Sequence, residues 1–455
     1  MSEQYEALPR EADTGDRPLH EPASWIKTSF NWLWEMATTI PDKPTKPADL
    51  LSPRMLVCLL VPALVIFLSW LEMPASATFA LNLIAIVLLS IVLTLATERL
   101  SLDLGPAGGA LLNISFGNLS ELIVLYVTAL ARGHIKIVQY SLLGSILVNV
   151  LLVLGLAMIV GGMKFKEQAY DREIAQLFVG LLNLTVFSFA IPMAFDATLW
   201  DTDISDEAAC TYSRVISIIL LGVYLVYLFF QFKPMQKKAK DALTSDEEAL
   251  LAYVQELSLP ELEGEGEEEE DVSKEDDHEV QQTAHPKPAV NKSWLHRLHL
   301  DFLLALALLL LSAVLIGISA DYVVSSFRHL NQRGVLGKSF VGLIILPVAG
   351  NVAEIVTAVI VAGKDEMDLA INVALGSALQ IGLFLAPITV LIGWGLQKEM
   401  TLIFGLYETV VLFASVLLVS FLMVQNKTTS LEGFMLASCF VVISIGAYVL
   451  PDPQH

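Results

Sequence analysis

The chain has 455 residues, of which 55% are apolar and 16% are charged, and its mean hydropathy is +0.63. Apolar runs of about 20 residues recur along it, and a run of that length crosses a hydrocarbon core. The composition therefore predicts a membrane protein and excludes most soluble enzymes. The formal net charge of -21 argues against a nucleic-acid partner and favours a cation as ligand. The three cysteines are scattered and indicate neither a disulfide nor a thiolate metal framework.

Residues 1–53 lack the short apolar core of a signal peptide, and we expect them to form a cytosolic N-terminal tail. About eleven apolar stretches follow, each expected to be a transmembrane helix. In chain order they are 54–73, 76–97, 107–131, 136–161, 174–195, 212–232, 300–322, 337–362, 367–395, 400–423 and 431–450, before a short tail, 451–455. Because Pro62 and Pro74 interrupt the first stretch, a re-entrant or interfacial segment is the alternative there.

The orientation follows from the distribution of basic residues. With eleven spans, 20 Lys and Arg residues lie on the side of the N-terminus and seven on the other side. Without the eight in the long segment 233–299, the counts are still 12 and seven. The excess of positive charge predicts a cytosolic N-terminus and a lumenal C-terminus.

Two similar segments stand on separate spans: residues 117–121 read Gly-Asn-Leu-Ser-Glu and residues 350–354 read Gly-Asn-Val-Ala-Glu. A Gly-Ser pair follows each, with Gly144 coming 27 residues after Gly117 and Gly376 coming 26 after Gly350. The two copies lie five spans apart, so they cross the membrane in opposite directions. Such an inverted repeat typically places a substrate site near the midplane, where discontinuous helices meet.

These patterns predict an all-α polytopic membrane protein with one additional N-terminal helix and two inverted five-helix repeats. The additional helix is 54–73, the first repeat is 76–232, and the second repeat is 300–450. We call the two repeats the first half and the second half. The segment 233–299 joins them as a cytosolic linker.

Three carboxylates, Glu121, Glu354 and Glu408, lie deep within predicted spans, and no Lys or Arg lies deep enough to pair with them. A charge at the centre of a bilayer costs about 2.5–3.5 kcal/mol on insertion scales, so each carboxylate needs a partner or a function. If the repeats bring Glu121 and Glu354 together, a divalent cation or protons must neutralise them. Competition between the two at one site is sufficient for antiport. For Glu408, which has no counterpart in the repeat, a structural hydrogen bond is the favoured interpretation.

Calcium fits such a site because it binds about six to eight oxygen ligands. Gly117 and Gly350 allow each helix to unwind and turn carbonyl oxygens towards the ion, and Asn118 and Asn351 add side-chain oxygens. Four further polar residues on apolar spans are candidates for the ion or proton pathway: Ser145, Asn149, Ser377 and Gln380. Two alternatives stay open, which are close helix packing at the Gly-Ser pairs and hydrogen bonds between helices for the two amides.

The linker carries the strongest charge of the chain. Between residues 261 and 279 there are twelve acidic residues and one Lys. The consecutive acidic residues are Glu267, Glu268, Glu269, Glu270 and Asp271. A disordered, solvated tether is one interpretation, and a cytosolic segment that gathers or senses calcium is the other.

Taken together, these segments resemble the calcium/proton exchangers of the cation/calcium antiporter superfamily, particularly the fungal vacuolar type. The resemblance extends from the second span to the C-terminus. It rests on residues 117–121 and 350–354, the run 138–145, the turn 364–369, Gly376-Ser377 with Gln380, residues 431–433 and residues 451–452.

The resemblance implies an antiporter that moves cytosolic calcium into an acidic organelle, here the vacuole, by alternating access. It implies no enzymatic activity and no cofactor, with calcium, protons and the lipid bilayer as partners and a homo-oligomer left open. Glu121 and Glu354 are implied as metal ligands and proton carriers, with help from Asn118, Asn351 and the carbonyls near Gly117 and Gly350.

The sequence departs from the family at two positions. Ile355 follows the second motif glutamate where family members commonly have His, and Val148 precedes Asn149 where a small hydroxyl residue is usual. Both departures bear on ion selectivity. Exchange of manganese or of a monovalent ion, and a sodium-driven calcium exchanger, are the alternatives. A channel or calcium-sensing scaffold is a third, against which the paired deep glutamates argue.

Overall fold

The computed structural model describes residues 53–71, 73–104, 118, 128–198, 207, 209–231, 292–334 and 336–450. Within these residues, seven helices are long and apolar enough to cross a membrane. A bent pair of helices, 338–350 and 352–362, meets the same criteria together, and two shorter apolar helices accompany them. The prediction of an all-α polytopic membrane protein is therefore confirmed, whereas the count of eleven spans stays a prediction.

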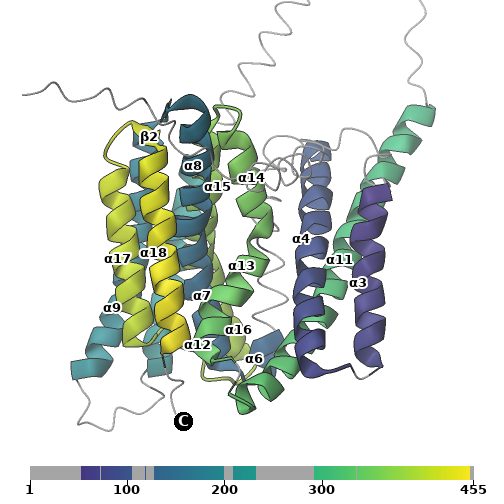
Figure 1. Cartoon of the computed structure of the whole chain (residues 1–455), viewed down its shortest axis with the longest axis horizontal. Coiled ribbons are helices and arrows are strands. Elements are labelled where there is room, and N and C mark those ends of the chain that lie inside the picture. The colour runs from purple at the N-terminus through teal and green to yellow at the C-terminus, as the bar shows by residue number, and fades with distance from the viewer. Residues whose placement is uncertain are drawn as a thin grey trace, which may run out of the picture. The chain divides into compact units, whose positions relative to one another are not determined.

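The elements of the first half and the additional helix follow the apolar stretches in chain order (Figure 1). They are α3 (Pro53–Trp70), α4 (Ala75–Asp103), α6 (Thr128–Ala131), α7 (Ile135–Leu147), the π-helical η2 (Val148–Val153), α8 (Leu154–Phe165), β1 (Glu167–Ala169), α9 (Arg172–Thr198) and a helix at Ala209–Gln231.

The second half begins with the long helix α11 (Lys292–Gln332). It continues with α12 (Lys338–Phe340), the π-helical η3 (Val341–Ile345), α13 (Leu346–Gly350), α14 (Val352–Ala362), α15 (Met367–Gln380), the π-helical η4 (Ile381–Leu385), α16 (Ala386–Gly395), α17 (Leu406–Leu422), β2 (Lys427–Thr429) and α18 (Ser430–Val449).

Three observed helices differ from expectation. Pro62 lies inside the continuous helix α3, so the alternative of an interrupted first span is not needed for the described residues. The helix α11 extends well beyond the predicted range 300–322 at both ends, because its flanking turns are polar and hydropathy does not detect them. The helix α17 begins at Leu406 rather than at residue 400, and residues 401–405 before it are not helical.

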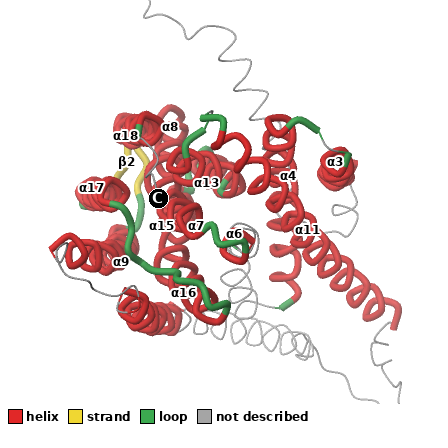
Figure 2. The backbone as a smooth tube through the Cα atoms, turned by 90° about the horizontal axis from the view of Figure 1, so that it is seen from below, coloured by secondary structure: helices red, strands yellow, loops and turns green. Residues whose placement is uncertain are grey.

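The helices pack in two groups within residues 43–455. The helices α3, α4 and α11 contact one another, and α4 also contacts α13 and α14. The second group contains described spans of both halves, with α7, α8 and α15 packed among α9, α14, α17 and α18 (Figure 2). This second group is where the two halves interlock.

Glycines mark the closest approaches between helices. A Cβ atom added to Gly433 of α18 would lie 2.5 Å from the carbonyl oxygen of Gly155 on α8, and one added to Gly155 would lie 3.0 Å from the carbonyl oxygen of Gly433. Backbones approach this closely only where side chains are absent, as in other helix pairs within membranes. Gly433 belongs to the motif 431–433, and its role in this structure is packing.

Loops from both halves meet at one end of the spans. The strand β1 pairs antiparallel with β2, with Gln168 opposite Thr428. The Gln168 side chain also donates from Nε2 to the carbonyl oxygen of Ala362 and to Oδ1 of Asp365, both at 2.9 Å. The three connected loops follow α8, α14 and α17, and the sequence predicts all three on the side of the N-terminus. Their direct contact agrees with that alternation.

Candidate functional site

The second motif lies at a break in a membrane-spanning segment. The helix α13 ends at Gly350 and α14 begins at Val352, while Asn351 between them has φ -100° and ψ 21°. The two segments are bent by 54°. The expected unwinding at Gly350 is thus shifted by one residue, because Gly350 keeps its helical conformation and Asn351 interrupts the helix. A new helix, α14, consequently begins within the span, and its N-terminus lies there.

Glu354 lies in the first turn of α14. The unpaired amide groups at a helix N-terminus carry a partial positive charge, which stabilises a carboxylate there. Glu354 is only partly buried, in contrast to the fully buried Asn351. The break therefore combines a stabilised carboxylate with the carbonyl end of the preceding helix.

Asn351 is held by contacts on both sides. Its backbone N–H and its side-chain Nδ2 each donate to the carbonyl oxygen of Pro347, the second residue of α13, at 2.9 Å. Its Oδ1 accepts a hydrogen bond of 2.6 Å from Nδ2 of Asn149. Asn149 belongs to η2, in the other half of the chain. The second motif is thus tied directly to the first half.

The first motif is tied to the second half in the same way. Asn118 donates from Nδ2 to Oε1 of Gln380 at 2.8 Å. Asn118 occupies the place in the first motif that Asn351 occupies in the second. Gln380 is the last residue of α15, before η4, and Asn149 lies two residues after the end of α7, in η2. The same cross-half amide contact occurs twice, as an inverted repeat requires. Both amides therefore make hydrogen bonds between helices, one of the two alternatives left open.

Asn149 has one further feature. It is fully buried, and its Nδ2 also donates to the carbonyl oxygen of Ser145 at 2.9 Å. Its Oδ1 is buried with no hydrogen-bond donor among the described residues. A buried oxygen that accepts no hydrogen bond from the described residues is available to a cation or to a hydrogen-bond donor.

Sequence reasoning missed the π-helical turns beside these amides. The segment η2 begins three residues after Ser145, and η4 begins four residues after Ser377. Single π-helical turns inside α-helices are frequent at functional sites. The residues of η2 and η4 are almost all apolar, like those of the surrounding helices. No pattern in the sequence could therefore have revealed the turns.

The two Gly-Ser pairs behave differently. A Cβ atom on Gly144 would contact the carbonyl oxygen of Leu343 and would lie 2.5 Å from Cγ of Pro347, so this glycine permits close packing of α7 on η3. A Cβ atom on Gly376 would meet no described heavy atom within 4 Å. Packing thus accounts for Gly144, while Gly376 and the half-buried Ser377 stay candidates for the pathway.

Some predicted site residues lie outside the described part of the chain. These are Gly117, Glu121, Glu267, Glu268, Glu269, Glu270 and Asp271. Among the described residues, no group of three or more His, Cys, Asp or Glu side chains forms a metal site. The geometry of the candidate ion site therefore rests on Gly350 and Glu354, the described counterparts of Gly117 and Glu121 in the second half.

Glu408 lies near the start of its helix. It is in the first turn of α17, where its carboxylate folds back over Gly405, and its side chain is buried. The helix begins six residues later than the apolar stretch suggested, so Glu408 is not in its middle. A carboxylate at a helix N-terminus is stabilised by the helix itself, which agrees with the structural role favoured for it.

Several residues of the family-like motifs hold loops rather than the site. Gln139 donates from Nε2 to the carbonyl oxygens of Thr401 at 3.0 Å and Ile403 at 3.1 Å, which fixes the extended segment before α17. Glu432 and Thr429 form a capping box at the start of α18. These residues explain part of the motif pattern through stability alone.

Comparison with known proteins agrees with this architecture. A family described as sodium/calcium exchanger protein matches residues 74–233 and 304–449. The chain is 37% identical over 383 residues to the vacuolar calcium ion transporter of Schizosaccharomyces pombe, covering 84% of this chain and 82% of that protein. It is 32% identical over 382 residues to the Ca(2+)/H(+) antiporter of Synechocystis, covering 84% and 93% of the two chains.

A solved structure supports the same relationship. The structure of native YfkE is similar to this chain with a TM-score of 0.66 at 26% sequence identity, and the alignment covers 87% of this chain and 100% of the other. Both halves and both motifs lie within the matched ranges. The chain therefore belongs to the sodium/calcium exchanger family.

Proposed function

We propose that this transporter is a secondary active antiporter that exchanges cytosolic calcium for protons across the membrane of an acidic organelle, the vacuole. Relatives named as a vacuolar calcium ion transporter and as a Ca(2+)/H(+) antiporter support the ions and the compartment. The observation that carries the site is the break at Asn351, which sets Glu354 in the first turn of a half-helix inside the span.

Glu354 and Glu121 are the proposed ion-binding carboxylates. Glu121 follows Asn118 by three residues, as Glu354 follows Asn351, and Asn118 contacts the second half through Gln380. Carboxylates, amide oxygens and the carbonyls near Gly350 supply only oxygen, the ligand atom that calcium prefers. The buried Oδ1 of Asn149 is a further oxygen of this kind.

Exchange follows from the two ways of neutralising the carboxylates. With calcium bound, both carboxylates are ionised and serve as ligands. With calcium released to the lumen, protons neutralise them, and the protein returns to the state that faces the cytosol without unpaired charges in the membrane interior. The two amide contacts join each motif to the opposite half, so a rearrangement at one motif acts on the other. Such coupling is what alternating access between inverted repeats requires.

The test is calcium uptake into proteoliposomes that hold the purified full chain and an imposed pH gradient. The unmutated chain is expected to take up calcium only while the gradient lasts, and a protonophore is expected to stop it. The variant Glu354→Gln keeps the size and the hydrogen-bonding capacity of the side chain but removes its charge. We expect it to lose proton-coupled uptake altogether.

Glu408→Gln is the matched control, because Glu408 is also a carboxylate in the first turn of a second-half helix but lies away from the motif. It is expected to keep uptake close to the unmutated rate. Uptake by Glu354→Gln at the unmutated rate would contradict the proposed site. Uptake that follows a sodium gradient and ignores pH would instead assign a sodium-driven exchanger.

Ion selectivity is the second measurement, because Ile355 stands where family members commonly have His. It follows Glu354 directly and is half-buried in α14, so no titratable side chain stands there. Competition of manganese, sodium and potassium against calcium uptake, in the unmutated chain and in Ile355→His, tests its effect. We expect calcium to be the preferred ion in both. A reversal of preference between calcium and manganese would assign the selectivity to this position.

A further inference from the structure

A second concave site lies at the end of the spans opposite to the β1–β2 pair. The span Ile135–Phe165 begins at this site and ends beside β1. The site is a pocket of about 250 Å³ between the turn that precedes α7, the end of α11 and the start of α12. Its polar lining residues are His134, Lys136, Arg328, Asn331 and Lys338. We call it the basic pocket, and none of the described residues that line it is acidic.

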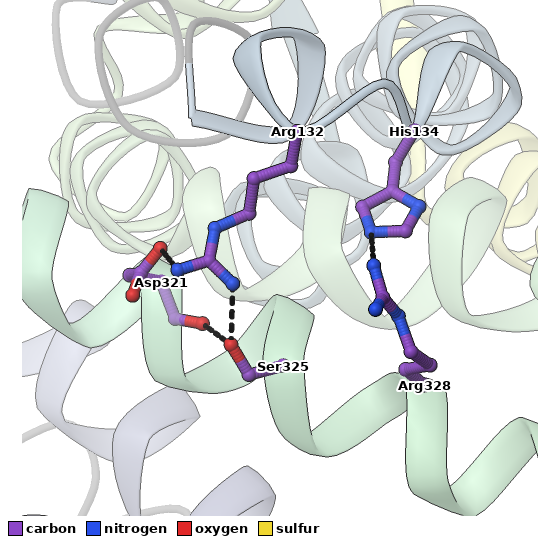
Figure 3. A network of polar contacts seen from close by, with 5 residues as sticks. All are labelled: Arg132, His134, Asp321, Ser325 and Arg328. Carbon is purple, nitrogen blue, oxygen red and sulfur yellow. Dashed lines mark hydrogen bonds and ion pairs between the residues drawn. The ribbon is translucent and has the colours of Figure 1, made fainter.

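Figure 3 shows the contacts beside the basic pocket. Arg328 lies with Nη2 at 3.2 Å from Nε2 of His134. A guanidinium can only donate, so the imidazole nitrogen accepts. His134 is therefore neutral in this contact, and the described partner of the Arg328 charge is an uncharged ring.

Arg132, on the same turn as His134, is balanced differently. It forms an ion pair with Asp321 and donates from Nη1 to Oγ of Ser325 at 2.7 Å, while that hydroxyl donates to the carbonyl oxygen of Asp321 at 2.7 Å. The carboxylate of Asp321 is thus paired with Arg132. The positive charge of Arg328 remains directed at the basic pocket.

The other charges around His134 are also mainly positive. Lys136 lies two residues after His134, on α7. The charge of Lys338, on α12, acts electrostatically on the His134 imidazole. The carboxylate of Glu408, on the neighbouring helix α17, lies within electrostatic reach of Lys136. Burial, and then the charges of Arg328, Arg132 and Lys338, lower the pKa of His134 below its ordinary value.

We propose that the basic pocket binds a tetrahedral oxyanion of the phosphate class, as a free anion or as a lipid headgroup, and binds it most tightly when His134 is protonated. Arg328 supplies a planar fork that matches two oxygens of such an anion, and Lys136 and Lys338 supply point charges. When His134 takes up a proton it can no longer accept from Arg328, and two adjacent cations result. An anion between them accepts a hydrogen bond from each.

Protonation and anion binding therefore reinforce each other. The anion raises the affinity of His134 for a proton, and the proton raises the affinity of the basic pocket for the anion by the same factor. Since the pKa of the empty site is lowered, the effect develops as the pH falls below about 6.5. The predicted orientation turns the pocket towards the lumen, where an acidic compartment would fill it.

The experiment is equilibrium dialysis of radiolabelled sulfate against the purified full chain in detergent at pH 5.5 and pH 8.0. Sulfate serves as the probe because its charge does not change in this range. Saturable binding is expected, severalfold tighter at pH 5.5 than at pH 8.0, because a protonated His134 adds a second cation beside Arg328. His134→Gln is expected to bind with one affinity at both pH values, because glutamine can accept from Arg328 but cannot titrate.

Arg328→Gln and Lys338→Gln are expected to weaken binding at both pH values. The matched control is Arg333→Gln, which removes a charge from the exposed turn after α11 without touching the pocket lining, and it is expected to bind like the unmutated chain. Elution of each variant as a monodisperse species establishes that it is folded. Absence of saturable sulfate binding at both pH values would overturn the proposal. So would binding that both pocket variants leave unchanged.

Two competitors distinguish the sources of the anion. If a short-chain phosphatidate displaces sulfate at much lower concentration than inorganic phosphate does, the natural ligand is a lipid headgroup. If the two are equally effective, it is a free anion. Displacement by neither would exclude the phosphate class and overturn the proposal in that form.

Discussion

At the scale of single residues, Asn149 connects packing with the candidate ion site. Its Nδ2 makes two hydrogen bonds, one within its own span and one to Asn351 in the other half. Its buried Oδ1 has no donor among the described residues. Leaving a buried polar group unsatisfied costs about 1–3 kcal/mol. A protein tolerates such a cost where the group serves a ligand, which is why we propose that Asn149 lies beside the ion.

Asn149→Ala is expected to abolish calcium uptake and to lower stability by about 1–3 kcal/mol, because the buried Oδ1 of Asn351 loses this donor. Asn183→Ala is the matched control. Asn183 donates from Nδ2 to the carbonyl oxygen of Val179 at 2.8 Å, four residues before it, and to Oγ of Ser420 in the second half at 2.8 Å. This pattern is the same as that of Asn149, but away from both motifs.

Thermal unfolding and uptake per folded molecule measure the two effects separately. Both variants are expected to lose stability, whereas only Asn149→Ala is expected to lose uptake. If Asn149→Ala keeps full uptake per folded molecule, the residue holds the helices together and takes no part in transport.

At the scale of elements, glycines determine how closely the halves approach. Gly144→Ala introduces a methyl group against the carbonyl oxygen of Leu343, so α7 must move away from η3. Overpacking of this kind costs about 1–3 kcal/mol. In Gly180→Ala, on helix α9, the added methyl meets no described heavy atom within 4 Å. There the better helix propensity of alanine is expected to add up to about 1 kcal/mol.

The thermal midpoint of each purified variant, recorded under one detergent condition, gives the comparison. Gly144→Ala is expected below the unmutated chain and Gly180→Ala at or above it. Equal midpoints for both variants would show that α7 and η3 have room to adjust, and the packing role assigned to Gly144 would be wrong.

The elements also show what hydropathy can and cannot predict. The apolar stretch 367–395 coincides with the span from Met367 to Gly395, because a span within lipid must be apolar along its length. The polar ends of α11 and the late start of α17 were missed, since helices continue or stop outside the apolar core for local reasons. The break at Asn351 was expected from its neighbouring glycine, yet the asparagine itself interrupts the helix.

At the scale of the whole molecule, the repeated motifs predicted two inverted halves but not the side chains that join them. Asn118 and Gln380 lie 262 residues apart and hydrogen bond directly. For Gln380 the sequence indicated either a place on the ion pathway or a hydrogen bond between helices, with no partner. It could not show which amide pairs with which, because that depends on how the two halves interlock. It also missed the basic pocket, whose residues come from three separate elements.

The orientation of the chain in the membrane can be tested at two exposed turns. After the native cysteines are replaced, Lys166→Cys places a thiol on the exposed turn before β1, and Arg333→Cys places one on the exposed turn after α11. These turns lie at opposite ends of the spans. If the excess of positive charge marks the cytosolic side, a membrane-impermeant maleimide is expected to label Lys166→Cys in intact vacuoles and to label Arg333→Cys only after permeabilisation.

Each variant serves as the control for the other, because detergent exposes both turns to the reagent. The reverse pattern would place the β1–β2 pair in the lumen and the basic pocket in the cytosol, and the proposed direction of calcium movement would have to be reversed with it. Labelling of both turns in intact vacuoles would contradict the odd number of crossings between them. Labelling at these two exposed turns therefore tests the proposed direction of calcium transport without changing a residue of the ion site.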